Sequence, residues 1–177
     1  MLVPGVLALL PEYAGLVDPV AELRAACSTA VGWLCWAPEV TVIADEQGAR
    51  VAAHLLEQAR SLRVTCPSEA DLRLMAGEGA AHLVVANGTA RRSEKAPGYL
   101  DERAAGFDAA LGTALRTPDP AALGGLDEEL AADLLVGNPA GLRELAGLLT
   151  VEHRLVFDHD DDPFGVQYWV MGWQCES

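Results

Sequence analysis

The sequence predicts an α/β fold: a mostly parallel central sheet with helices on both faces and a C-terminal antiparallel hairpin. Short apolar runs rich in β-branched residues alternate with longer segments of helical periodicity. The last part of the chain carries two strand-like runs joined by a polar link rich in Asp, Pro and Gly, which is typical of a hairpin. With 177 residues, 51% of them hydrophobic, the chain suits one domain with a sizeable core.

In the first half of the chain, apolar runs predict strands and capping residues predict helix starts. Residues 1–10 are expected to form the first buried strand, because this run is too short to cross a bilayer. Asp18 and Pro19 then open a helix to about Trp36, since Asp caps free N–H groups and Pro is tolerated in the first turn. The other expected elements are strands at 40–44 and 62–66 and helices at 49–60 and 68–75.

The second half begins with a buried strand at 82–86 and ends with the hairpin. Asn138 is the expected cap of a helix that starts at Pro139. The hairpin strands are expected at 154–157 and 166–173, with the polar residues between them forming its turn. The predicted helices span residues 101–115, 126–135 and 139–149.

Charge and cysteine content limit the classes of partner. The chain has 12 Lys and Arg against 26 Asp and Glu, a net charge of −14. Nucleic acids and anionic membranes bind clustered cations, so neither is an expected partner. The four cysteines show no paired CxxC spacing, and the apolar start lacks a positively charged leader. We therefore expect an acidic cytoplasmic protein.

A basic loop follows the strand at 82–86 and stands out in this acidic chain. Residues 86–100 read ANGTARRSEKAPGYL and contain the only lysine, Lys95. Open α/β sheets bind ligands at the carboxyl ends of their strands, and guanidinium and backbone N–H donors favour anions. The alternative is a solvated loop whose arginines balance nearby acids. The candidate site for a small anionic molecule comprises Asn87, Gly88, Arg91, Arg92, Ser93 and Lys95.

The same region resembles the class III extradiol ring-cleavage dioxygenases. The segments LVVANGTARRS at 83–93, APGY at 96–99 and AGFD at 105–108 are similar to a strand, turn, loop and helix of the family's catalytic ring-opening subunit. The likeness continues at 119–123, 137–142 and 164–170, so its specific part covers about residues 82–173. The loop is most similar to a short, actinobacterial-type branch without an established activity. The resemblance implies one dioxygenase-like domain over residues 1–177.

The resemblance also implies an iron site, which can be checked residue by residue. Family members hold Fe(II) with two His and one carboxylate, a set that suits non-haem iron, and another His moves protons. In this chain the matching positions hold Gly5, Ala44 with Asp45, Gly137 with Asn138, and Arg91. None of these residues supplies the expected iron ligand or base. The segment between the second strand and the basic loop is also shorter than is usual in the family. We therefore expect a catalytically degenerate protein with no cofactor and no catalytic residue.

A second hypothesis is an active metal-dependent dioxygenase or hydrolase with relocated ligands. His and carboxylate side chains suit zinc or iron, and several carboxylates suit harder cations. This hypothesis requires the donors to converge on one ion, whereas an Asp-rich turn before Pro is common for backbone reasons alone. The possible ligands are Asp45, Glu46, His54, His153 and the acidic stretch Asp158, His159, Asp160, Asp161 and Asp162.

A third hypothesis is a structural or interaction protein. Trp169 and Trp173 share one face of the expected last strand, and Trp33 and Trp36 share a helix face. Such residues are usually core, but aromatic side chains are also enriched at subunit interfaces. We therefore expect a homo-oligomer.

Overall fold

A computed structural model of the chain describes residues 1–34, 37–62, 81–150 and 152–175. It is an α/β structure whose elements include three short 3-10 turns, η1, η2 and η4. The bounds are β1 Leu2–Val3, η1 Leu7–Leu9, η2 Pro11–Tyr13, α1 Ala21–Leu34, β2 Val40–Ile43, α2 Glu46–Leu62, β3 Ala81–Val85, α4 Arg103–Arg116, α5 Pro120–Gly124, α6 Glu128–Asp133, α7 Pro139–Leu148, β4 His153–Asp161, η4 Pro163–Gly165 and β5 Tyr168–Cys175.

The five strands form one sheet in the order β2-β3-β1-β5-β4. β3 pairs in parallel with both β1 and β2, whereas β5 pairs antiparallel with both β1 and β4. The predicted α/β class and the C-terminal antiparallel hairpin are therefore confirmed. The sheet is mixed rather than mostly parallel, because the hairpin joins it through β5 and adds two antiparallel pairings.

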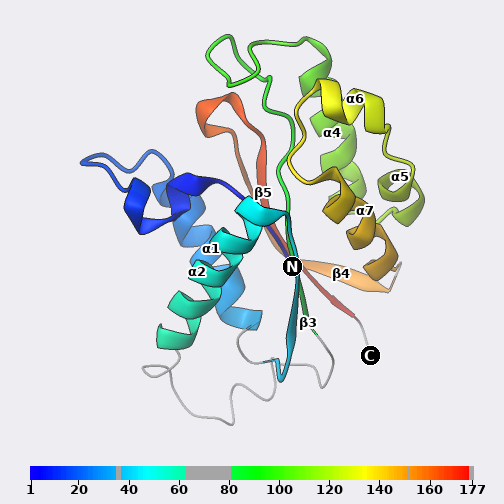
Figure 1. Cartoon of the computed structure of the whole chain (residues 1–177). Helices are drawn as coiled ribbons and strands as arrows, with labels where there is room; N and C mark the ends of the chain where they lie inside the picture. Colours follow the sequence, from blue (N-terminus) through cyan, green and yellow to red (C-terminus); the bar gives the residue numbers. More distant parts are fainter. Residues whose placement is uncertain (35–36, 63–80, 151, 176–177) are drawn as a thin grey trace.

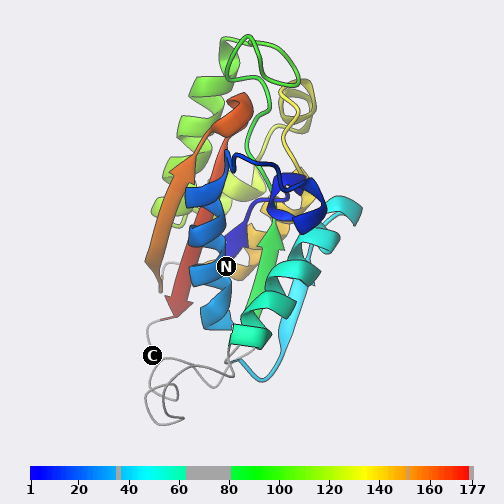
Figure 2. The ribbon, with the colours of Figure 1, turned by 90° about the vertical axis from the view of Figure 1, so that its left-hand side faces the viewer.

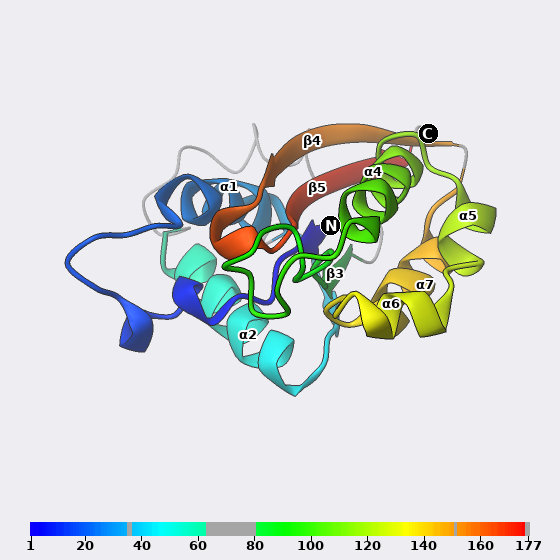
Figure 3. The same cartoon turned by 90° about the horizontal axis from the view of Figure 1, so that it is seen from above.

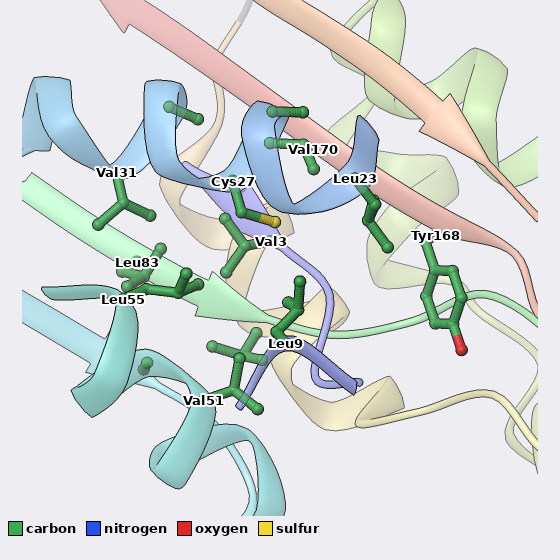
Figure 4. Close-up of a cluster of buried hydrophobic side chains, with 14 of the residues drawn as sticks. Val3, Leu9, Leu23, Cys27, Val31, Val51, Leu55, Leu83, Tyr168 and Val170 are labelled. Carbon is green, nitrogen blue, oxygen red and sulfur yellow. The ribbon is translucent and has the colours of Figure 1, made fainter. Parts of the chain in front are cut away.

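Helices cover both faces of this sheet and divide the core into two layers (Figure 1, Figure 3). α1 and α2 lie on one face, which Figure 2 shows from their side, and α4 to α7 lie on the other. On the first face Val3, Cys27, Val51 and Leu83 belong to one buried cluster, part of which Figure 4 shows. On the second face Trp169 lies in a separate cluster with the apolar residues of α4 to α7.

Helix starts agree well with the capping residues of the sequence. The side chain of Asn138 accepts a hydrogen bond from Gly141 N, and Pro139 opens α7 as predicted. α2 begins earlier than predicted, because the Asp45 carboxylate accepts from Gly48 N at 2.6 Å. α5 was not predicted from the sequence. It nevertheless begins with an Asp followed by a Pro, Asp119 and Pro120, which is the same pattern that predicted the start of the first helix.

Two expected elements differ in extent. The first strand is only Leu2–Val3, because Pro4 has no N–H and the Gly5 N–H bonds the Asn87 side chain instead of a strand. The first half of the expected hairpin turn at 158–165 is strand, since β4 continues to Asp161, and the turn itself is made by Asp162 and η4. Of the strand expected at 62–66, only Leu62 is described, and it ends α2 instead; the rest of that strand, the helix expected at 68–75 and Trp36 lie outside the described residues.

Within the described part of the chain, no helix is long and apolar enough to span a membrane.

Candidate functional site

The basic loop lies where the parallel strands end and the chain changes face. The connection that follows β1 leads to α1, whereas the connection that follows β3 leads to α4 on the opposite face (Figure 3). When the connections after two neighbouring parallel strands lead to opposite faces of an open sheet, the place between them is the topological switch point, where ligands usually bind. The Asn87 Oδ1 atom accepts from Gly5 N at 2.9 Å and so joins the two connections at this point.

A buried carboxylate on α4 holds the start of the loop. Asp108 accepts from Thr89 N at 2.9 Å and from the Thr89 hydroxyl at 2.6 Å. Arg92 Nη1 donates to the same carboxylate at 3.2 Å, and its Nε atom lies 3.2 Å from an Asp162 oxygen. Arg92 is thus neutralised by two carboxylates of the protein, and its role is to join the loop to α4 and the hairpin.

Gly88 lets the loop approach the residue before β5. Gly88 N donates to Gln167 O at 2.8 Å, and Gln167 N donates to Thr89 O at 3.0 Å. A Cβ atom on Gly88 would lie 2.7 Å from both an Asp108 oxygen and the Gln167 Cβ. No real side chain fits there without a shift, so a glycine is required for this close approach.

Ser93 and the hairpin turn make the next contact. Arg92 N donates to Gly165 O at 3.0 Å, and Gly165 has a φ of 69°. The Ser93 side chain packs against the Cα of Gly165, where a Cβ would collide with the Ser93 hydroxyl. Ser93 therefore supports the shape of the loop.

Arg91 and Lys95 differ from Arg92 in having no carboxylate partner. Arg91 packs its side chain against Gly98 and is partly buried, and its Nε atom is inaccessible and has no hydrogen-bond partner. Lys95 is exposed, and neither residue forms an ion pair with any residue in the described ranges. Hydrogen bonds from Arg103 lower the pKa of nearby Asp101 to about 2. Arg91 adds to this lowering through its charge, without a hydrogen bond to the Asp101 carboxylate. Among the described residues, no carboxylate forms an ion pair with either of these two cations, Arg91 and Lys95.

Backbone strain also gathers at this end of the molecule. Every residue with positive φ in the described ranges flanks the loop or belongs to it: Tyr99, Leu135, Asn138, Phe164 and Gly165. The four that are not glycine each cost about 1–3 kcal/mol, and such residues cluster at functional sites. A Cβ on Gly98 would meet both Leu135 and Arg91, which places one strained residue beside the unpaired arginine. Figure 1 shows the loop, α6 and the hairpin turn together at the upper end of the protein.

The positions that the resemblance implies for iron lie close together but do not fit a metal. Gly5 has Gly48 beside it, and a Cβ on Gly5 would lie 3.2 Å from Val85 Cγ1. The Asp45 carboxylate already accepts from Gly48 N. The Asn138 amide donates to Val85 O at 2.8 Å and accepts from Gly141 N at 3.1 Å. No imidazole occupies these positions, and Asp45 Oδ1 and Asn138 Oδ1 each accept from a backbone N–H, so these residues do not fit an Fe(II) site.

The relocated ligands of the second hypothesis do not converge. Asp45 and Glu46 follow β2 at one edge of the sheet, whereas His153, His159 and their acidic neighbours lie on β4 at the other edge. Among the residues that the structure describes, no three His, Cys, Asp or Glu side chains come together as a metal site. On β4, Arg116 instead pairs with Asp158 and Asp160.

Trp169 and Trp173, the residues expected to contribute to an interface, take part in the protein's own packing. Trp169 is 1% exposed in the second core layer, and the Trp173 indole N–H donates to Leu115 O at 3.0 Å. Trp33 is partly exposed, and its ring meets Phe157 edge-on. Trp169 therefore offers no surface to a partner.

Sequence reasoning missed Asp108 and Thr89 as the residues that build the loop. The pattern that identifies Asp108 was present: it lies four residues after Ala104 and three before Leu111, inside the buried stripe of α4. A charge within an apolar stripe needs partners, and here they are Thr89 and Arg92.

Comparison with known proteins assigns no family to this α/β protein. No protein-family model matches the chain, and no curated protein matches it.

Proposed function

We propose that the chain is a metal-free, catalytically degenerate relative of the class III extradiol dioxygenases that binds a small anion beside Arg91 and Lys95. The observation that carries the proposal is the unpartnered Nε atom of the partly buried Arg91. A buried polar group without a partner is rare in native proteins and calls for an ion, a water or a ligand.

The setting makes this arginine unusual. The chain carries a net charge of −14, and six other arginines form ion pairs with carboxylates: Arg24, Arg50, Arg92, Arg103, Arg116 and Arg143. Arg91 lies at the switch point of the sheet, where ligands gather, and is left without such a pair. A guanidinium group has N–H donors and no acceptor, so Arg91 is suited to bind an anion and not to act as a base.

The six candidate residues then fall into two groups. Asn87, Gly88, Arg92 and Ser93 bond or pack within the protein and hold the loop in shape. Arg91 offers guanidinium N–H donors, which suit a carboxylate or a phosphate, and Lys95 adds a compact positive charge at the surface. The ligand therefore interacts mainly with Arg91 and Lys95.

Anion binding is tested by calorimetric titration with inorganic phosphate, sulfate and citrate. We expect at least one of them to saturate a single site, and Arg91→Ala to weaken it about tenfold or more, since a charge-assisted hydrogen bond contributes about 1.5–3 kcal/mol. Arg91→Lys keeps the positive charge but loses the planar guanidinium group. Its affinity for the anion should therefore lie between those of the wild type and Arg91→Ala. Arg60→Ala is the matched control, because Arg60 is exposed on α2 and pairs with no carboxylate in the described ranges.

Two results would count against anion binding. Equal affinity of the wild type and folded Arg91→Ala would remove Arg91 from the site, and no binding of any probe would remove the site itself. The metal-free part is tested separately, by elemental mass spectrometry of protein purified without chelator. Near-stoichiometric retention of one metal would contradict it.

A further inference from the structure

The sequence contains two asparagines, and both lie at the candidate site: Asn87 in the basic loop and Asn138 at the start of α7. Asparagine is among the thermolabile residues of proteins, because the backbone nitrogen of the next residue can attack its side chain. The attack is least hindered when the next residue is glycine, which has no Cβ, and it is blocked when that residue is proline, which has no N–H. Asn87 is followed by Gly88 and Asn138 by Pro139, so the reaction is open only to Asn87.

The reaction is deamidation, and it needs only the chain and water. The Gly88 nitrogen loses its proton and bonds to Asn87 Cγ, the Cγ–Nδ2 bond breaks, and the amide nitrogen leaves as ammonia, which takes up that proton. A cyclic succinimide remains. Water then opens the ring at either of its carbonyl groups and leaves aspartate or isoaspartate at position 87. No electrons are gained or lost, so no oxidant, reductant or cofactor takes part.

In the folded loop both reacting groups are already held by hydrogen bonds. Gly88 is buried, and its N–H donates to Gln167 O at 2.8 Å, so the attacking nitrogen is bound to the residue before β5. Asn87 Oδ1 accepts from Gly5 N at 2.9 Å, which fixes the side-chain amide to the connection after β1. Cyclisation therefore has to break the bond from Gly88 and release the amide from Gly5.

The Asn87 side chain is also packed against a third segment. Asn87 N donates to Gly137 O at 2.9 Å. A Cβ on Gly137 would lie 2.8 Å from Asn87 Nδ2 and 3.0 Å from Asn87 Cβ, so the amide lies directly against this glycine. The asparagine and the glycine that follows it are thus held by Gly5, Gly137 and Gln167, which belong to three different connections. The start of the loop must separate from these contacts before the chain can cyclise.

We propose that Asn87 is a deamidation site that the folded loop keeps closed, and that it reacts when the loop separates from Gln167. The product does not fit the contacts that it left. Isoaspartate adds a methylene to the backbone next to Gly88, where a Cβ would already lie 2.7 Å from an Asp108 oxygen and from the Gln167 Cβ. The reaction therefore makes a transient opening of the loop permanent. This proposal does not rest on anion binding.

The test is peptide mapping by mass spectrometry of the full chain kept at pH 8, in buffer and in concentrated urea. We expect Asn87 to deamidate about tenfold or more slowly in buffer than in urea, which corresponds to about 1.4 kcal/mol or more for opening of the loop. Asn138 is the internal control and should stay unmodified in both solutions. Equal rates for Asn87 in the two solutions, or no reaction in urea, would overturn the proposal.

A matched pair of variants tests whether the loop controls the reaction. Asp108→Ala frees Thr89 at the start of the loop and should speed deamidation in buffer several-fold, with no change in urea. Asp162→Ala breaks only an exposed ion pair of Arg92 and should leave both rates unchanged. Limited proteolysis then compares modified with unmodified wild type, and the isoaspartate form should be cut faster within residues 86–100. An unchanged rate in folded Asp108→Ala, or equal cleavage of the two forms, would contradict the proposal.

Discussion

Two segments that follow neighbouring strands at the same end of the sheet are built in opposite ways. The loop after β3 is fixed to the interior by Asp108, and it makes further backbone bonds with Gln167 and Gly165. Residues 11–19, the arm that follows β1 and η1, pair with Arg24 and Arg50 through Asp18 and Glu12, and their Leu16 and Val17 side chains are exposed. The strands are alike and parallel, so the difference arises from the residues that follow them.

This difference shows what a buried carboxylate contributes to a loop. Asp108 supplies acceptors for an N–H, a hydroxyl and a guanidinium, so the loop can hold strained residues and an unpaired arginine in place. In the arm, by contrast, Leu16 and Val17 remain exposed to water.

Removal of Asp108 should have the largest effect. Asp108→Ala leaves Thr89 and Arg92 without their acceptor, and we expect it to lower the free energy of unfolding by about 3 kcal/mol. The control is Asp162→Ala, which removes an exposed partner of Arg92 and should cost less than about 1 kcal/mol. Urea denaturation measures both. Equal costs would show that burial of Asp108 does not support the loop.

The close approach at Gly88 gives the next largest effect. Gly88→Ala places a methyl group against Asp108 and Gln167, so we expect a loss of about 2 kcal/mol in the free energy of unfolding. Gly106→Ala is the control, because no atom lies within 4 Å of its added Cβ on α4, and it should stabilise by about 0.5–1 kcal/mol. If Gly88→Ala were neutral, the loop would be more adaptable than its contacts indicate.

The base of the arm gives a smaller effect, confined to the arm itself. Arg24→Ala removes the donors that hold Leu9 O and Ala8 O, so the arm should be cut several-fold faster in limited proteolysis. Arg50→Ala breaks only an exposed pair with Glu12 and should change the rate little. Cleavage sites mapped by mass spectrometry must fall within residues 11–19. Faster cleavage of the basic loop instead would mean that the two segments are coupled.

The core beneath the arm should show the smallest effect. Burial raises the pKa of the Cys27 thiol to about 12, so at pH 8 in the native protein it lacks the thiolate that alkylating reagents attack. Peptide mapping should find Cys27 unlabelled in both wild type and Arg24→Ala. Labelling of Cys27 in the variant would show that the arm closes the core.

The same pKa shift gives a pH dependence with a definite sign. The Cys27 thiol has an ordinary pKa of 9.0 and a raised one in the fold, so the unfolded chain ionises first as pH rises. The stability that this group contributes is complete below pH 9 and is lost between pH 9 and about 12. Cys27→Ala should remove that part of the alkaline loss of stability.

Local patterns in the sequence predicted the elements whose ends are set by local chemistry. Asn138 and Pro139 start α7 as expected, and the apolar runs of β2 and β3 lie within about one residue of their predicted positions. The extent of β4 was not predictable in this way. Its acidic residues look like a turn, but Arg116 from α4 neutralises Asp158 and Asp160 and lets the strand continue.

The candidate site was predictable in position but not in the roles of its residues. The place of the loop follows from the strand that precedes it, whereas the separation of Arg91 from Arg92 depends on tertiary contacts. Arg92 is taken up by Asp108 on α4 and by Asp162, 70 positions further along the chain. The positions of two adjacent arginines in the sequence therefore do not predict which of them forms ion pairs.

The place of β1 in the sheet has a consequence for the order of folding during synthesis. This strand precedes both of its partners along the chain, because Leu2 pairs with Val84 of β3 and with Met171 of β5. The centre of the sheet therefore stays open along one side until the last strand emerges. Such long loop closures are slow, and the exposed strand edges in the meantime are prone to aggregate. Newly made chains should accordingly depend on chaperones more than the finished protein does.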